Sequence, residues 1–260
     1  MEVQIKKAVK AGNSSAVILP RAWLNKEIRV ELVRKTSETI LSDALDIAKK
    51  YADLKDIIGI YLIGSYARGE EDENSDIDVL VITDNIDKEM INEGIYNILI
   101  ISSELLKQKL SYDLFPIGPM IKEAKPLINS NYLSSIKVEV TKGNIKWYLD
   151  TTNDKLKIIK KVIGRVKADG QYLSDKIAYT LVLRIRTLLM IKNIIQNKTY
   201  SKKEFIKLIN RISKGENAYE GYLSVKNNLA EKKRISVEEC KMLYNYLDNQ
   251  LTGIREMLRY

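Results

Sequence analysis

Two aspartates that stand two residues apart, Asp76 and Asp78, are the residues of this sequence best suited to chemistry. They open the alternating run Asp76 to Val81, which predicts a strand, and side chains two apart on a strand point to the same face. Two carboxylates side by side among apolar residues are costly without a partner. Oxygen ligands of this kind suit Mg²⁺ (or Mn²⁺), which commonly joins protein carboxylates to substrate phosphates.

A glycine–serine pair, Gly64 and Ser65, precedes these aspartates at the end of an apolar run. Gly64 lacks a Cβ, so a phosphate can approach its backbone closely. Ser65 offers a hydroxyl and an N–H group, and a helix beginning there would add further amides for an anion. Hydrogen-bond donors that suit a triphosphate, at Gly64 and Ser65, are thus followed along the chain by carboxylates that suit the metal ions of that triphosphate. This combination predicts attack on an α-phosphate with pyrophosphate as the leaving group.

The whole pattern resembles the signature of the polymerase-β-type nucleotidyltransferases. It consists of the apolar run Ile57 to Ile63, the pair Gly64-Ser65, ten residues, and then Asp76-Ile77-Asp78. The resemblance covers residues 36–135. It is greatest to the minimal nucleotidyltransferases and to enzymes of the kanamycin nucleotidyltransferase type. It implies an NTP substrate, for which we expect ATP. For Arg68, a plain surface position without a role in binding is an alternative. The implied metal-binding and catalytic residues are Asp76 and Asp78, and the implied nucleotide-binding residues are Gly64, Ser65, Arg68 and Ser75.

The sequence departs from this family at one position. The family usually places a third carboxylate on the next core strand, where it completes the metal site and can act as a base. The matching position here is Asn97, whose amide carries no charge and accepts no proton at neutral pH. Glu93 and Glu104 lie near that strand but do not fit the spacing. Three alternatives follow: another carboxylate takes the place of the third one, the activity is weak, or the domain binds a nucleotide without transferring its nucleotidyl group.

The segments around the motif predict a mixed α/β domain with helices. Apolar residues at 3.6-residue spacing predict a helix over 36–55, with Thr36 or Ser37 as its cap. The predicted strands are 57–63, 76–82 and 95–101, with a short helix over 88–93. Residues 102–110 are predicted to begin another helix. Residues 115–135 are predicted to be irregular structure with one short helix.

Residues 3–35 predict a small β element. Val3 to Lys6 and Ile28 to Leu32 alternate as strands do, and Gly12 to Ser15 is a turn cluster. The run Val9 to Arg21, with Val30-Glu31-Leu32 after it, resembles the AbrB/MazE swapped-hairpin domain. That family forms intertwined dimers, and many members bind DNA. The resemblance implies a homodimer, with DNA contact or mere dimerisation as open alternatives.

The last third of the chain predicts a bundle of four or five helices. Helical patterns run over Leu156 to Val166 and from the cap Ser174 to Gln196, and capping boxes begin at Ser201 and Ser236. The segment from Ala178 to Phe205 is similar to the helical companion domains of kanamycin-type enzymes and of HEPN proteins. The chain contains no histidine, which the HEPN ribonuclease motif requires, so ribonuclease activity is excluded.

Charge is distributed unevenly along the chain, whose net charge is +9. Residues 36–150 hold 12 basic and 20 acidic residues, whereas residues 151–260 hold 23 and 11. A basic helical region favours phosphate-rich partners, although solvated helix faces explain it equally well. No segment has the length and apolarity of a membrane span or a signal peptide, so we expect a cytoplasmic protein. The single cysteine, Cys240, is expected to be a small apolar residue.

We therefore predict three domains: a β element at 1–35, a nucleotidyltransferase domain at 36–143 and a helical bundle at 144–260. The predicted activity is transfer of NMP from an NTP to a hydroxyl on an unidentified acceptor, with nucleic acid and protein as candidates. The alternative is a weakly active or inactive nucleotide-binding protein that acts as a DNA-binding regulator or in the manner of an antitoxin.

Overall fold

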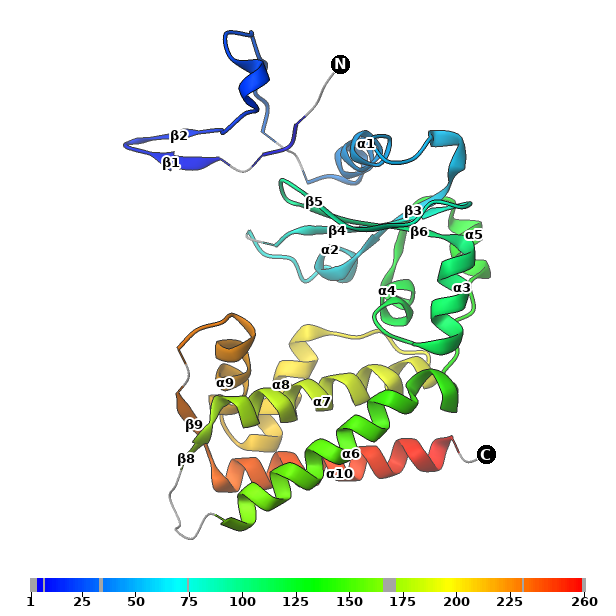
Figure 1. Cartoon of the computed structure of the whole chain (residues 1–260). Helices are drawn as coiled ribbons and strands as arrows, with labels where there is room; N and C mark the ends of the chain where they lie inside the picture. Colours follow the sequence, from blue (N-terminus) through cyan, green and yellow to red (C-terminus); the bar gives the residue numbers. More distant parts are fainter. Residues whose placement is uncertain are drawn as a thin grey trace. The chain divides into compact units, whose positions relative to one another are not determined.

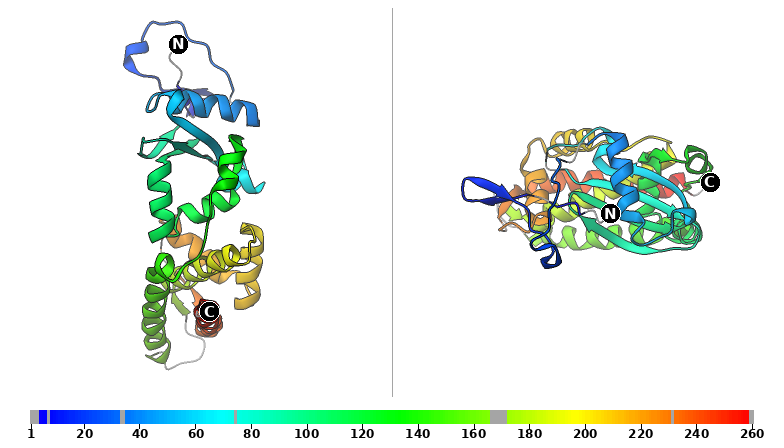
Figure 2. Two further views of the ribbon diagram at one scale, coloured as in Figure 1. Left: turned by 90° about the vertical axis from the view of Figure 1, so that its right-hand side faces the viewer. Right: turned by 90° about the horizontal axis from the view of Figure 1, so that it is seen from above.

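The computed structural model describes residues 4–6, 8–32, 35–73, 75–165, 172–230 and 232–258. Contacts between residues divide the chain into two compact units, whose elements are drawn in Figure 1 and, from two further directions, in Figure 2. The first unit comprises Met1–Gln108 and Glu123–Lys137, and the second comprises Lys109–Lys122 and Val138–Tyr260. Lys109–Lys122 thus groups with the helical unit, and the predicted domain bounds stay predictions.

The first unit is built on a five-stranded mixed sheet with the strand order β5-β6-β4-β3-β7. Strands β4 and β6 are parallel, and the other neighbouring pairs are antiparallel. The three central strands are long apolar runs, as expected where both faces of a sheet are covered. This sheet confirms the predicted fold class. The strands are β3 (Ile57–Ile63), β4 (Ile77–Thr83), β5 (Lys88–Glu93), β6 (Tyr96–Ser102) and β7 (Lys125–Ile128).

Helix α1 (Ser37–Ala48) packs its apolar stripe against this sheet. Thr36 caps it, and a reciprocal hydrogen bond with Thr39 completes a capping box. The helix predicted over 36–55 is therefore confirmed, although it ends seven residues earlier. This unit also contains the 3-10 turn η2 (Leu54–Asp56) and the short helices α2 (Gly64–Arg68) and α5 (Ser130–Ser135). Helices α3 (Ser103–Tyr112) and α4 (Ile117–Glu123) each run across a boundary between the two units.

The two edge strands correct the sequence-based prediction. The short helix predicted over Lys88–Glu93 is wrong, because this segment is β5, with Glu93 opposite Tyr96 on β6. Gly94, at φ +64°, forms the tight turn between them, where a left-handed backbone favours glycine. Likewise the segment 115–135 contains β7. Its Pro126 weakens a strand prediction, but an edge strand tolerates a residue without an N–H group.

The N-terminal element is a hairpin of β1 (Val9–Ala11) and β2 (Ser14–Ala16), followed by the 3-10 turn η1 (Arg21–Trp23). The predicted strands at its two ends are wrong for the described residues, because 4–6 and 28–32 have no strand partner. Within the described part of 4–32, Ile5 alone is buried, against Gly94. A hairpin of this size lacks a core of its own.

The second unit is mainly helical, as predicted, and a small sheet joins β8 to β9. Ser174, Ser201 and Ser236 cap helices as expected, whereas the helix predicted from Leu156 begins much earlier. Among the described residues, no helix is both long and apolar enough to cross a membrane. The bounds are α6 (Lys142–Arg165), β8 (Tyr172–Ser174), α7 (Asp175–Ile195), α8 (Lys202–Ser213), α9 (Asn217–Lys226), β9 (Lys233–Ser236) and α10 (Val237–Met257).

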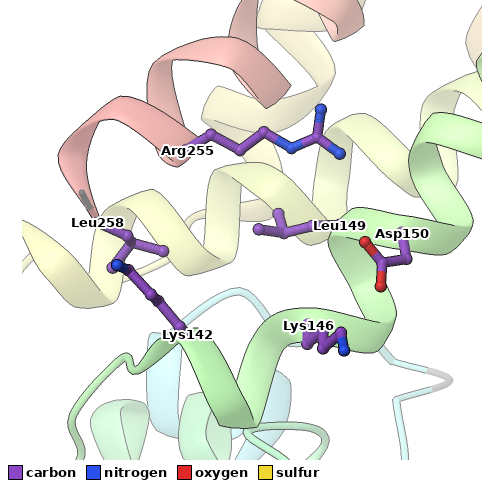
Figure 3. A pocket seen from close by; sticks show the side chains of 6 residues that line it. All are labelled: Lys142, Lys146, Leu149, Asp150, Arg255 and Leu258. Atoms are coloured by element: carbon purple, nitrogen blue, oxygen red, sulfur yellow. The ribbon is translucent and has the colours of Figure 1, made fainter.

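The core of the second unit is formed by the inward stripes of its helices. Cys240 on α10 is completely buried, and burial raises the pKa of its thiol to about 12. This agrees with the expected role of a small apolar residue. A pocket of about 330 Å³ lies between α6 and α10, and Figure 3 shows the side chains around it. Its lining residues are Lys142, Lys146, Leu149, Asp150, Arg255 and Leu258.

Candidate active site

The register between β3 and β4 places Asp78, one of the two aspartates of the predicted metal site, at the end of β3. Asp78 on β4 pairs with Ile63, the last residue of β3, and on its other side with Asn97 of β6. Asp76 lies just before β4 and is exposed, whereas Asp78 is half-buried. The alternate residues Ile77 and Val79 are fully buried. The two aspartates are therefore on the face opposite these core residues, as strand periodicity requires.

Gly64 begins α2 directly beside Asp78. Its φ is +69°, a left-handed conformation that favours glycine, and a Cβ built on it would lie 2.2 Å from Asp78 Oδ2. No other residue fits there without displacing the carboxylate. Ser65 follows in the first turn of α2, and this five-residue helix ends at Gly69, with φ +67°. The glycine–serine turn and Asp78 thus lie side by side, and the roles predicted for them stay predictions.

Glu123, at the end of α4, is the residue of this site that the sequence did not reveal. Its Oε1 accepts a hydrogen bond of 2.9 Å from the backbone N–H of Gly64, and its Oε2 accepts one of 2.5 Å from Arg68 Nη1. Glu70 accepts a 3.0 Å bond from Arg68 Nε. Arg68 therefore lies at the glycine turn, held between two carboxylates. Burial lowers its pKa, but Glu123 and Glu70 outweigh this effect and raise it overall.

The electrostatics of the aspartate pair fit a cation. Burial raises the pKa of Asp78; the hydrogen bond from Asn97 opposes this effect, and the charge of Asp76 adds to it. The two carboxylates are thus close enough to repel each other. Among the described residues, no group of three or more His, Cys, Asp or Glu side chains forms a metal cluster. A pair of carboxylates still fits Mg²⁺, which commonly binds one or two carboxylates together with substrate phosphates.

Two comparisons with known proteins bear on this geometry. Residues 43–139 match the family model described as Nucleotidyltransferase domain. A protein of Methanocaldococcus jannaschii that is named for protein adenylyltransferase activity is 33% identical over 145 residues, covering 51% of this chain and 87% of that relative. This chain belongs to the polymerase-β-type nucleotidyltransferases.

Solved structures of nucleotidyltransferases are similar only at a low level. The spectinomycin adenyltransferase AAD(9) of Enterococcus faecialis, solved with ATP and spectinomycin, is 15% identical, with a TM-score of 0.39. The match covers 81% of this chain and 99% of that one. A nucleotidyltransferase-like protein of Exiguobacterium sibiricum is 12% identical, with a TM-score of 0.38, over 82% of this chain and 75% of its own.

Asn97 is the residue that the family resemblance matches to the usual third carboxylate. The parallel register sets it opposite Asp78, and its Nδ2 donates a 3.0 Å hydrogen bond to Asp78 Oδ1. Neither nearby glutamate replaces it. Glu93 pairs with Lys50 at 2.7 Å, and Glu104 is exposed on α3. An amide in this position orients Asp78, but it cannot remove a proton from an acceptor.

Ser75 and Lys35 complete the surroundings of the motif. The Ser75 hydroxyl accepts a 2.8 Å hydrogen bond from the N–H of Asp72, which closes the turn that leads into Asp76. Its predicted contact with the nucleotide stays a prediction, as do the predicted roles of the other site residues. Lys35 Nζ lies 5.5 Å from the ring centroid of Tyr66 on α2. No sequence pattern links this lysine to a motif that begins 29 residues later.

Proposed function

We propose that this nucleotidyltransferase transfers AMP from ATP to a hydroxyl group of a protein. The observation that carries the proposal is the pairing of Asp78 with Ile63, which sets the aspartate beside the glycine–serine turn. ATP as the donor and a protein as the acceptor are supported by the name of the M. jannaschii relative. A nucleic-acid hydroxyl is the alternative acceptor.

The reaction forms one bond and breaks one. The acceptor oxygen bonds to the α-phosphorus, while the bond from that phosphorus to the bridging oxygen of the β-phosphate breaks and pyrophosphate leaves. Asp76 and Asp78 would hold Mg²⁺ or Mn²⁺, which neutralises phosphate charge and polarises the phosphoryl oxygens. Ser65 and the Gly64 N–H would bind phosphate oxygens, and Arg68 would offset their charge. The acceptor proton leaves to solvent, because Asn97 cannot take it.

Glu123 gives this mechanism a specific requirement. Its carboxylate accepts hydrogen bonds from Gly64 N–H and Arg68, the same donors that the proposal assigns to phosphate. The carboxylate must therefore release at least one of these donors when a triphosphate binds. Because Glu123 and Glu70 share a single arginine, the site is acidic, and a free triphosphate would be repelled unless divalent cations accompany it.

The proposal is tested by label transfer. We expect label from α-³²P-ATP to appear in a protein fraction with Mg²⁺, and label from GTP, CTP or UTP to transfer less. Chelation by EDTA should abolish the signal. Digestion of the product separates the acceptors, since a protease removes label from protein and a nuclease removes it from nucleic acid. Absence of Mg²⁺-dependent label with all four nucleotides would contradict the proposal.

The N-terminal element is proposed to join two copies of the chain. It exposes large apolar side chains, with Ile18, Leu24, Val30 and Leu32 each at least 70% exposed. Pairing with a second copy would cover such surface. We expect light scattering to give the mass of a dimer, and Ile18→Glu with Val30→Glu to give a monomer. A monomeric wild-type protein would contradict the dimer.

A second candidate function is nucleotide binding without transfer, in a regulatory or antitoxin-like protein. Asn97 favours it, because the amide supplies no base. Nucleotide binding that depends on Asp78, with no label transfer to any acceptor, would support this reading over the catalytic one.

A further inference from the structure

The pocket between α6 and α10 in the second unit is lined by three cationic side chains and two leucines (Figure 3). Lys142 and Lys146 come from α6, and Arg255 comes from the end of α10. Leu149 of α6 and Leu258, directly after α10, supply the apolar part of the lining. The volume of about 330 Å³ is in the range of small-molecule sites. This cavity, hereafter the α6–α10 pocket, therefore has the size and the mixed lining that a small organic anion requires.

Helical spacing places the charged groups of α6 along one face. Lys142, Lys146 and Asp150 follow one another at four-residue intervals, at which side chains on a helix are neighbours. Arg255 projects from α10 into the same pocket (Figure 3). With three basic side chains and one acidic one, the α6–α10 pocket has an excess of two positive charges.

These four charged side chains have no partners among the residues that the structure describes. None of them makes an ion pair or a side-chain hydrogen bond there, although Asp150 lies four residues from Lys146. Lys157, further along the same helix, does pair with Asp154, at 3.1 Å. Cations held around one pocket without anions repel one another. A bound dianion would relieve that repulsion.

The charge and the lining of the pocket select a phosphate monoester with an apolar body. Such a phosphate carries roughly −1.5 to −2 charge at neutral pH, which matches the excess of two positive charges. Arg255 offers N–H donors in a planar fork that fits phosphate oxygens, and the two lysines add compact charges. The leucines would cover the apolar body. Asp150 would accept a hydrogen bond from a hydroxyl group on that body.

We propose that the α6–α10 pocket binds a small phosphate monoester, with the phosphate on its three cations and the apolar body on its two leucines. The ligand is either a nucleoside monophosphate, whose ribose hydroxyls would donate to Asp150, or a phosphate monoester without such hydroxyls. This site shares no residue with the turn at Gly64 and does not depend on the proposed transfer reaction.

The test is calorimetric titration of the full-length protein, in EDTA, with AMP, phenyl phosphate, inorganic phosphate and adenosine. We expect AMP or phenyl phosphate to bind about tenfold more tightly than inorganic phosphate, because only the esters cover the apolar lining. Adenosine, without the phosphate, should bind more weakly than AMP. Lys142→Gln and Arg255→Gln should each weaken binding of the esters roughly tenfold, in the range of one charge-assisted hydrogen bond.

Lys155→Gln is the matched control. Lys142 and Lys155 are both exposed on α6, so both variants should fold, but only Lys142 lines the pocket. Asp150→Ala distinguishes the two kinds of ligand. This variant should weaken AMP and strengthen phenyl phosphate if a ribose hydroxyl bonds to Asp150, and it should strengthen both if the ligand has no such hydroxyl.

Three results would overturn the proposed pocket site. They are an unchanged affinity in Lys142→Gln and Arg255→Gln, a loss of equal size in Lys155→Gln, and inorganic phosphate that binds as tightly as both esters. Binding lost in Arg68→Gln but kept in Arg255→Gln would place the phosphate at the glycine turn. That outcome also overturns the pocket site, and it leaves the proposed function intact.

Discussion

Asp78→Asn is expected to reduce label transfer from ATP by roughly 10²- to 10³-fold, the size of effect seen when one group that stabilises a transition state is removed. Asp78 is the half-buried member of the pair, between Ile63 and Asn97 in the sheet. An asparagine there loses the charge that holds a metal ion. Its carbonyl oxygen can still accept the hydrogen bond from Asn97 Nδ2, so local structure should be retained.

The measurement compares initial rates of label transfer with saturating Mg²⁺, together with thermal unfolding of each variant. The midpoint of unfolding should not fall for Asp78→Asn, because the change removes a partly buried charge that Asp76 repels. Asp84→Asn is the control, since Asp84 is an exposed residue beyond the same strand. Activity that survives in Asp78→Asn would show that the aspartate pair does not carry the reaction.

Asn97→Asp is expected to increase the rate of transfer by about 10²-fold, the lower end of what a positioned general base contributes. Register already sets residue 97 opposite Asp78, and the 3.0 Å hydrogen bond between the two side chains shows that they face each other. A carboxylate at this position would provide the missing third acidic group. It would add a third negative charge to the site, so without metal the variant should unfold at a lower temperature.

This second prediction therefore has two readouts that must agree. The rate should rise, and the midpoint of unfolding should rise more steeply with Mg²⁺ in Asn97→Asp than in the wild type. Asn92→Asp is the matched control, because Asn92 pairs with Asn97 from the edge strand β5 and makes the same chemical change. A rate unchanged from wild type, with a metal response like that of Asn92→Asp, would mean that the lost carboxylate does not limit this protein.

The site could be predicted from the sequence where its geometry is local. Asp76, Asp78 and the glycine–serine turn follow from alternation along one strand and from the end of another, which are short-range patterns. Asn97 was found through the family resemblance, which expects a third carboxylate on the next core strand, and the parallel register of the structure sets it opposite Asp78. Glu123 lies 59 residues from Gly64, in a segment flanked by prolines, and nothing local marks its carboxylate as a partner of that backbone N–H.

The fold shows the same contrast between features that local sequence patterns predict and features that they do not. The buried strands β3, β4 and β6 carry strong apolar patterns and were predicted to within one residue, and the caps marked where helices begin, although α1 ends seven residues before its predicted end. The edge strand Lys88–Glu93 is exposed on most positions, so its side chains do not alternate as those of a half-buried strand do. The N-terminal segments 4–6 and 28–32 alternate, but they have no partner strand among the residues that the structure describes. Alternation alone does not make a strand where backbone hydrogen bonds have no acceptor.

The path of the chain between the two units limits how the protein can be cut into fragments and how its parts can be exchanged by recombination. The polypeptide leaves the first unit within α3, returns to it at Glu123 and leaves again after Lys137. The chain passes between the units three times, after Gln108, Lys122 and Lys137, so no single cut separates two intact units. A single breakpoint before Glu123 would part this glutamate from Gly64 and Arg68, and one after Lys137 would leave Lys109–Lys122 with the first unit. The helical region therefore cannot be exchanged like an appended module. Exchange of the whole helical unit needs all three breakpoints, and Glu123 then stays with Gly64 and Arg68 as part of the segment Glu123–Lys137.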